Sequence, residues 1–288
     1  MIGTRHVTVI GAGTMGTGIA YACARAGHEV LITDESPDQR KRGMLTIGAA
    51  FAKAVDRGKS TEEERLEGLA RVRSAATVGD AVVGAQVVIE AIPENLELKR
   101  RLFQEIEPLV SGETLLASNT SSLPIGEIAR GLRTPSRCLG LHFFNPAAVM
   151  QLVEIVRAEA TSEAALESAR FFVTSLGKTP IIVKDVPGFA TSRLGVVLGL
   201  EAIRMLEQGV ASAEDIDRAM ELGYNHPMGP LRLSDLVGLD VRLAIADHLF
   251  ATLGGATYAA PALLREKVSR GELGRKSGQG FYRWEKDR

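Results

Sequence analysis

The sequence predicts an α/β fold in which an N-terminal, mostly parallel sheet with a helical insertion precedes a C-terminal all-α domain. Over residues 1–185, short apolar runs alternate with helical segments, which is typical of a parallel sheet covered on both faces. Residues 37–70 interrupt this alternation with helical patterns alone. After residue 185 the patterns are helical as far as the tail, so we expect two domains, residues 1–185 and 186–288.

The first strand, residues 7–10, ends in a turn of sequence G-x-G-x-x-G that opens a helix. In such a turn the first glycine allows the tight bend and the second leaves room for a pyrophosphate. The third lets the helix pack against the strand. The N–H groups and the dipole of the helix start then favour phosphates. The sequence therefore predicts a Rossmann-type dinucleotide site built from Gly11, Gly13, Thr14, Met15 and Gly16.

The second strand, residues 29–33, ends in Asp34. A carboxylate at this point accepts a hydrogen bond from a ribose 2′-hydroxyl and repels the 2′-phosphate of NADP. The plain alternative is a strand–turn–helix with a surface aspartate. The order of strand, glycines, helix and acid argues against that alternative, so we expect NAD as the cofactor.

The insertion begins with a long helical stretch, residues 37–58, that is rich in arginine and lysine. Residues Ser60, Thr61, Glu62 and Glu63 then resemble a capping box that starts a second helix. The basic residues fit two interpretations equally well. They form either an ordinary solvated face or a docking site for an anionic ligand beside the dinucleotide.

The bulk properties of the 288 residues fit an ordinary globular protein, with 45% hydrophobic and 24% charged residues. The net charge of −1 offers no attraction for nucleic acid or an anionic membrane, and we expect neither as a partner. The start of the chain lacks a signal-peptide pattern, and Cys23 and Cys138 lack metal-like spacing. We therefore expect a cytoplasmic protein without a metal.

Polar residues follow two apolar strands. The run 86–92 is typical of a buried parallel strand, and Glu94 and the helix-capping Asn95 come after it. The strand 114–118 ends in a polar cluster, residues 118–122. Ligands of open α/β sheets bind at the carboxyl ends of the strands. Both segments are therefore candidates for ligand contact, although either alone could be an ordinary polar turn.

Oxidation of an alcohol needs a base for the hydroxyl proton, and histidine suits this role near neutral pH. Of the five histidines, His142 alone lies near the carboxyl end of a core strand, residues 137–144. Glu154 interrupts the apolar strand 151–156, and a buried carboxylate needs a partner. The loop 145–150 could bring the two side chains together, so that the carboxylate fixes the imidazole tautomer. The alternative is that His142 is a buried, hydrogen-bonded residue of the core without a catalytic role.

The C-terminal domain opens with a helix, residues 189–208, that is apolar nearly all round. One small helical domain can hardly cover such a helix, so we expect a homodimer interface here. The tail 274–282 is glycine-rich and basic, and its plain interpretation is a flexible end.

The motif V-I-G-A-G-T-M-G opens the chain, and I-E-A-I-P-E-N, S-N-T-S-S-L, G-L-H-F-F-N-P, V-P-G-F, P-M-G-P and G-x-G-F-Y follow. With these motifs the chain resembles the 3-hydroxyacyl-CoA dehydrogenases of β-oxidation over essentially its whole length. The resemblance implies NAD-dependent, reversible oxidation of an (S)-3-hydroxyacyl-CoA to the 3-ketoacyl-CoA. It also implies an N-terminal NAD-binding domain and a C-terminal domain for substrate binding and dimerisation.

Site residues follow from the same resemblance. His142 would be the acid/base, Glu154 its partner, and Ser121 a contact to substrate and to the nicotinamide side. The implied contacts to NAD are Glu94, Lys99, Asn119, Asn145 and Lys276. Lys53 of the insertion would contact coenzyme A.

One position departs from the family pattern. After Pro-Gly-Phe the family usually has Asn before Arg, whereas Ser192 precedes Arg193 here. That Asn lies at the substrate carbonyl in the family, so Ser192 would take its catalytic role with a shorter reach. Loss of such a donor can cost ~2.7–4 kcal/mol of transition-state stabilisation.

Two other functions remain compatible with the sequence. A dehydrogenase of a free hydroxy acid, such as a sugar acid, could use the same dyad but would need no docking surface for coenzyme A. A non-catalytic NAD(H)-binding protein is disfavoured by His142, Glu154 and Ser121, and mildly favoured by Ser192.

Overall fold

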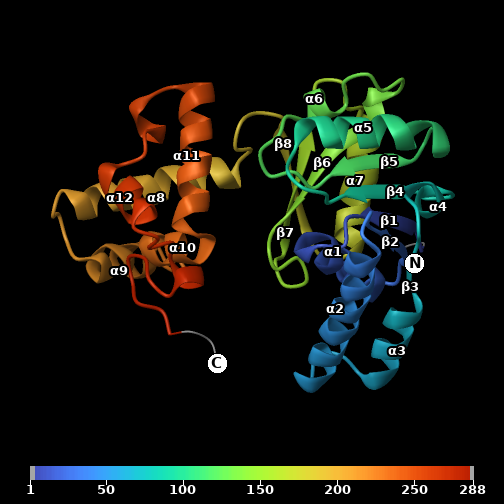
Figure 1. The fold of residues 1–288 in the computed structure, drawn as a ribbon, viewed down its shortest axis with the longest axis horizontal. Coiled ribbons are helices and arrows are strands. Elements are labelled where there is room, and N and C mark those ends of the chain that lie inside the picture. Colours follow the sequence, from blue (N-terminus) through green and yellow to red (C-terminus); the bar gives the residue numbers. More distant parts are fainter. Residues whose placement is uncertain (1–3, 286–288) are drawn as a thin grey trace. The chain divides into compact units, whose positions relative to one another are not determined.

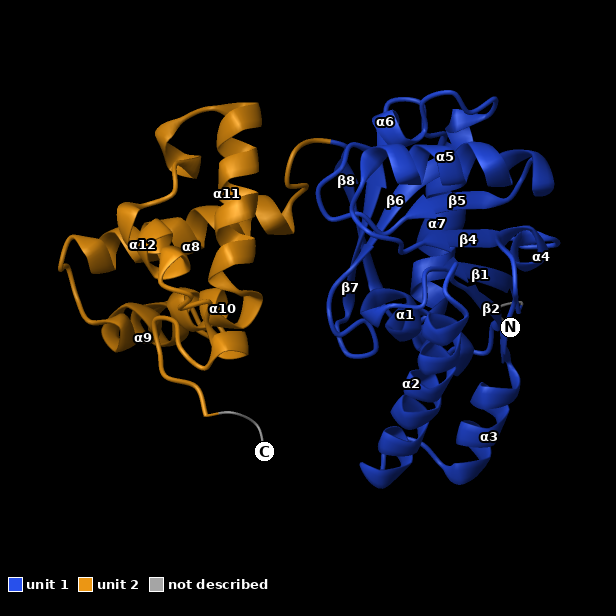
Figure 2. Ribbon diagram, in the orientation of Figure 1, with its two compact units in different colours: residues 1–185 blue, residues 186–288 orange. Residues whose placement is uncertain are grey.

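The structure is a computed structural model, and it describes residues 4–285. The chain divides after Asp185 into two compact units (Figure 2). The division falls just after the last described strand, and the later described residues form helices and two isolated β-bridges.

The first unit is built on an eight-stranded sheet with the order β3-β2-β1-β4-β5-β6-β7-β8. All neighbouring strands are parallel except β6 and β7, which pair antiparallel. The mostly parallel sheet predicted from the sequence is therefore confirmed. The strands are β1 (His6–Ile10), β2 (Glu29–Thr33), β3 (Val72–Ser74), β4 (Val87–Glu90), β5 (Leu115–Ser118), β6 (Cys138–Phe143), β7 (Leu152–Arg157) and β8 (Thr179–Lys184).

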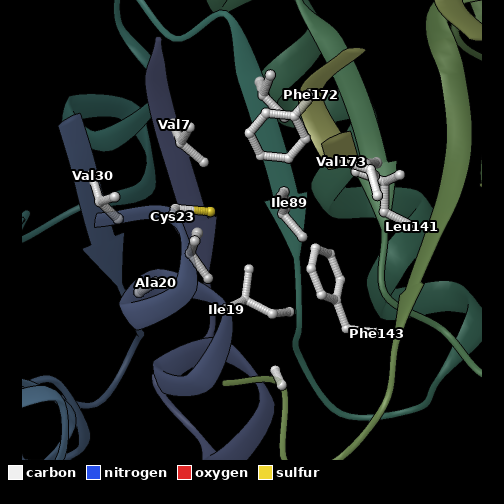
Figure 3. Close-up of a cluster of buried hydrophobic side chains, with 14 of the residues drawn as sticks. Val7, Ile19, Ala20, Cys23, Val30, Ile89, Leu141, Phe143, Phe172 and Val173 are labelled. Carbon is white, nitrogen blue, oxygen red and sulfur yellow. The ribbon is translucent and has the colours of Figure 1, made fainter. Parts of the chain in front are cut away.

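Helices cover the sheet of the first unit (Figure 1). They are α1 (Thr14–Arg25), α2 (Pro37–Asp56), α3 (Glu62–Ala70), α4 (Val78–Val82), α5 (Leu96–Ile106), α6 (Ile125–Ile128) and α7 (Glu163–Ser175). Helices α1 and α7 contribute to the same buried cluster, in which Ile19, Ile89 and Phe172 lie together (Figure 3). These side chains have no exposed area, so this face of the sheet is core.

The opposite face of the same strands carries polar residues. Glu90 pairs with Ser118 across β4 and β5, and Ser118 pairs with Gly140 across β5 and β6. Paired residues share a face and successive side chains alternate, so His142, two residues past Gly140, shares this face as well. It is the face away from Ile89, and it therefore carries the carboxylate of Glu90 and the imidazole of His142.

The insertion is the helical hairpin α2–α3. Ser36 caps α2 and Pro37 opens it. The capping box of α3 joins Thr61 with Glu64. The capping box predicted over residues 60–63 therefore began one residue too early. Gly68 of α3 packs so closely on Phe51 of α2 that a β-carbon there would lie 2.3 Å from the phenyl ring.

The second unit consists of α8 (Thr191–Glu207), α9 (Ala213–Gly223), α10 (Pro230–Val237), α11 (Leu239–Leu253) and α12 (Ala262–Ser269). The plain interpretation of residues 274–282 as a flexible end is wrong. The buried carboxylate of Asp235 accepts hydrogen bonds from the N–H groups of Phe281 and Tyr282, at 2.9 Å each, and from Trp284 Nε1 at 2.8 Å. These three bonds hold the glycine-rich segment against α10.

Among the described helices, none combines the length and the apolar character that crossing a membrane requires.

Candidate active site

The glycine turn after β1 is shaped by two close contacts. Gly11 has φ +108°, and a β-carbon there would lie 2.5 Å from Ala91 O. A β-carbon on Gly16 would lie 1.8 Å from Gly11 O. By contrast, Gly13 has no atom within 4 Å of the corresponding position. The fold itself therefore needs the first and third glycines, while the second leaves open space at the start of α1.

Asp34 is fixed beside this turn. Its Oδ2 accepts a hydrogen bond from Ala12 N at 2.9 Å, and its Oδ1 accepts one from Ser36 N at 3.0 Å. Gly13 is the N-cap of α1 and provides no side-chain acceptor for the first turn. The turn thus combines N–H donors for phosphates with a carboxylate for a ribose, which is the arrangement a dinucleotide needs.

Glu94, after β4, is tied to the polar loop after β5. Its Oε1 accepts hydrogen bonds from Thr120 Oγ1 at 2.6 Å, Ser122 Oγ at 3.0 Å and Ser121 N at 3.2 Å. Burial alone would raise the pKa of Glu94, but the bond from Thr120, the Lys99 ammonium and the bond from Ser122 hold that pKa below its ordinary value. Glu94 is therefore ionised at neutral pH and brings Ser121 to the strand ends.

Beneath Glu94 lies a buried ion pair. Lys99 Nζ donates to Glu90 Oε1 at 2.5 Å and to Ile92 O at 3.2 Å, and it lies 3.3 Å from Glu94 Oε2. Lys99 is 1% exposed and Glu90 is fully buried. We did not identify Glu90 from the sequence, although an acidic residue within an apolar strand was the signal that identified Glu154.

Asn119, the first residue after β5, connects this region with β6. Its Oδ1 accepts a hydrogen bond from Phe143 N at 2.9 Å, and its own N–H donates to Glu90 O at 2.9 Å. Asn119 therefore links the ends of β4 and β6, next to His142.

His142 and Glu154 form a hydrogen-bonded pair. The distance between His142 Nδ1 and Glu154 Oε2 is 2.7 Å, and Glu154 is fully buried. The ring of Phe144 lies against the imidazole, with 4.4 Å between the centroids. A buried carboxylate at Nδ1 fixes the tautomer of a histidine and stabilises its charged form. The pair is thus suited to moving a proton through Nε2.

A cleft of about 350 Å³ lies between α1, α2 and the loop after β6. Gly13 and Thr14 line it on one side, Asn145 on another, and Arg42 and Thr46 from α2. Met15, next to the turn, packs against the apolar core of the unit. Lys53 is exposed near the end of α2 and is not among the lining residues. Sequence reasoning did not identify Arg42 or Thr46 individually, although Arg42 belongs to the basic stretch.

Two predicted site residues belong to the second unit. Ser192 is the second residue of α8. Lys276 lies in a short 3₁₀ turn, Arg275–Ser277, where its Nζ donates to Asp240 Oδ2 at 2.6 Å. Their roles toward substrate and NAD stay predictions.

Residues 6–186 match the family described as 3-hydroxyacyl-CoA dehydrogenase, NAD binding domain, and residues 188–284 match the corresponding C-terminal domain. The chain is 42% identical to a probable 3-hydroxybutyryl-CoA dehydrogenase of Bacillus subtilis, over 98% of each chain. It is 44% identical to a 3-hydroxybutyryl-CoA dehydrogenase of Mycobacterium tuberculosis, over 96% of this chain and 98% of that relative. The crystal structure of an (S)-3-hydroxybutyryl-CoA dehydrogenase of Ralstonia eutropha is 39% identical, with a TM-score of 0.93 over 99% of this chain and 100% of that one.

Proposed function

The chain belongs to the 3-hydroxyacyl-CoA dehydrogenase family and is an NAD-dependent oxidoreductase, and on that premise we propose that His142 and Glu154 carry its chemistry. The reaction is the reversible oxidation of an (S)-3-hydroxyacyl-CoA to the 3-ketoacyl-CoA. The 2.7 Å contact between the two side chains, at the carboxyl end of the sheet, is the observation that supports this proposal most strongly.

In the direction of oxidation, His142 Nε2 takes the proton of the substrate hydroxyl. Glu154, hydrogen-bonded at Nδ1, stabilises the imidazolium that results. Bound NAD supplies the acceptor for the hydride that leaves C3. Ser121 donates a hydrogen bond to the substrate oxygen, and Ser192 does so in a lesser role. In the reverse direction, His142 returns the proton to the oxygen as the ketone is reduced.

For NAD, we propose that the N–H groups at Gly13, Thr14 and Met15 hold the pyrophosphate and that Asp34 accepts a ribose hydroxyl. The open space at Gly13 and the fixed carboxylate of Asp34 fit this cofactor. On the nicotinamide side we assign Glu94, Asn119, Asn145 and Lys276, whereas Lys99, which is 1% exposed, acts there through its ion pair with Glu94.

For the acyl-CoA, we propose that the basic insertion is a docking site, because Arg42 and Thr46 of α2 line a cleft next to Gly13 and Thr14, the proposed position of the pyrophosphate. We also propose a contact to coenzyme A for Lys53, which lies about two turns past Thr46 on α2. A dehydrogenase of free hydroxy acids would need no such site. A thermal shift with coenzyme A alone distinguishes the two substrate classes, because only the acyl-CoA enzyme should be stabilised.

The dyad is tested with His142→Gln, measured by NADH oxidation with acetoacetyl-CoA. We expect kcat to fall by roughly 10²–10⁴, with unchanged NADH binding. Near-native turnover in the folded variant would remove His142 from the acid/base role.

We further propose a homodimer formed by the second unit. Large apolar side chains on its helices are exposed, among them Leu194 at 71%, Leu222 at 79% and Phe250 at 47%. A second copy is the partner that the apolar character of α8 led us to expect. Light scattering after size exclusion should give twice the chain mass, and Leu194→Glu should reduce it. We also propose a cytoplasmic location, which the two free thiols support.

A further inference from the structure

We propose that Glu90 is a positioning residue for the cofactor, which holds Lys99 so that Glu94 keeps its bonds to the loop of Ser121. The inference depends on the proposed binding of NAD at these strand ends. It assigns a role to a side chain that is fully buried and so acts through its neighbours.

Glu90 lies at the centre of the sheet, at the end of β4, paired with Ile10 of β1 and Ser118 of β5. Both of its oxygens are used. Oε1 accepts from Lys99 Nζ at 2.5 Å and from Ile92 N at 2.7 Å, and Oε2 accepts from Ser118 Oγ at 2.6 Å. The carboxylate therefore joins α5, the segment after β4 and the end of β5.

The charges explain how this arrangement affects Glu94. The Lys99 ammonium lies between two carboxylates, 2.5 Å from Glu90 and 3.3 Å from Glu94. The shorter contact is to Glu90, so Glu94 keeps Oε1 for its three donors from the loop. If Glu90 loses its charge, Glu94 is the remaining anion within reach of Lys99. Glu94 would then be drawn inward, away from Thr120, Ser121 and Ser122.

A stabilising role alone is a poor explanation for this pair. Taking two charges out of water is costly, and apolar replacements of buried pairs are often neutral or stabilising. Burial raises the pKa of Glu90, and Lys99 and the bonds from Ser118 and Ile92 only partly oppose that rise. The location of the pair beneath Glu94 gives it a function that apolar side chains could not provide.

The test is a double-mutant cycle of Glu90→Gln and Lys99→Met, with the dissociation constant of NADH measured by its fluorescence. We expect Glu90→Gln to weaken NADH binding about tenfold or more. In the Lys99→Met background, Glu90→Gln should alter the dissociation constant of NADH less than about twofold. Glu90 acts through Lys99, so the effects of the two substitutions should not add. Because Glu94 also holds the loop of Ser121, which we propose contacts the substrate, kcat/KM for acetoacetyl-CoA should fall together with NADH binding.

Glu107→Gln is the matched control. Glu107 is also buried in the first unit, where it accepts hydrogen bonds from the N–H groups of Arg133 and Thr134. This variant should lower the thermal stability without changing NADH binding. If Glu90→Gln does not fold, Ser118→Ala removes one donor to Glu90 and should weaken NADH binding several-fold.

The positioning role would be overturned if Glu90→Gln left the dissociation constant of NADH unchanged. It would also be overturned if Glu90→Gln weakened NADH binding equally in the wild type and in Lys99→Met. In the Ser118→Ala variant, unchanged binding would do the same. If the wild-type protein itself fails to bind NADH, the proposed cofactor site is wrong instead.

Discussion

His142 and Glu154 are directly opposite each other in the antiparallel pair β6–β7, and this register places Nδ1 and Oε2 2.7 Å apart. Opposed residues on antiparallel strands have β-carbons about 4.5–5.5 Å apart on one face, which suits an imidazole and a carboxylate. Among the described strands, β6 and β7 are the only antiparallel neighbours. The reversal of the chain after β6 is therefore what creates the dyad.

Replacing Glu154 by Gln should lower kcat by roughly 10²–10⁴ while NADH binding stays within about twofold. The amide keeps the shape of the side chain but carries no charge to stabilise the imidazolium. Steady-state kinetics with acetoacetyl-CoA and NADH fluorescence measure the two effects. Equal loss of turnover and of NADH binding would point to a general structural defect instead.

The glycines of the turn should separate folding from cofactor binding. Gly13→Ala should fold normally, because φ is −75° and the added β-carbon meets no atom within 4 Å. It should nevertheless lose NADH binding, since the methyl group occupies the approach of the pyrophosphate. Gly16→Ala should lower the melting temperature sharply, because its β-carbon would overlap Gly11 O. Tight NADH binding by Gly13→Ala would contradict the proposed position of the pyrophosphate.

Changing Ser192 to Asn should raise kcat/KM for acetoacetyl-CoA, by up to about a hundredfold if the longer amide reaches the substrate oxygen. Ser192→Ala is the control and should lower it. If neither variant differs from the wild type, Ser192 does not contact the reacting oxygen.

Both cysteines should be unreactive in the folded protein. Burial raises the pKa of Cys23 and of Cys138 to about 12, so thiolate is scarce at pH 8. A thiol reagent should label neither residue in buffer and both in denaturant. Fast labelling of the native protein would show that one of these sites opens readily.

Glu94 should contribute to stability at neutral pH and lose that contribution in acid. Its pKa in the folded protein is below the ordinary 4.5, so the unfolded chain binds the proton more readily. The stabilisation is complete above the ordinary pKa and disappears as the pH falls through the lower, folded value. The difference in unfolding free energy between wild type and Glu94→Gln should therefore shrink below about pH 4. If the difference in unfolding free energy instead grew as the pH fell, the pKa of Glu94 would be raised in the folded protein and not lowered.

Much of the fold was predictable because its signals are local. Gly11 must adopt φ +108° and Gly16 must touch the preceding turn, so the residue types themselves reveal the turn. Asn95 accepts a hydrogen bond from Leu98 N, as its helix-capping role requires. The mostly parallel sheet also followed from the alternation of apolar runs with helices.

Contacts between distant segments were harder to predict. Asp235 holds Phe281 and Tyr282, more than forty residues along the chain, and nothing in the glycine-rich tail indicates that anchor. Glu90 meets Lys99 only because α5 packs over the end of β4. In each case the partner is selected by how whole elements pack, which no short pattern encodes.

The sequence by itself determined the glycine turn, Asp34 and the candidates His142 and Glu154, because each depends on residue type and on its place along one strand. Only the tertiary structure decided that His142 and Glu154 meet, that Glu94 is fastened to the loop of Ser121, and that the cleft is lined by Arg42 and Thr46 but not by Lys53. The physical reason is that strand register and helix packing are set by the burial of many side chains together. A hydrogen bond between two distant residues follows from that packing.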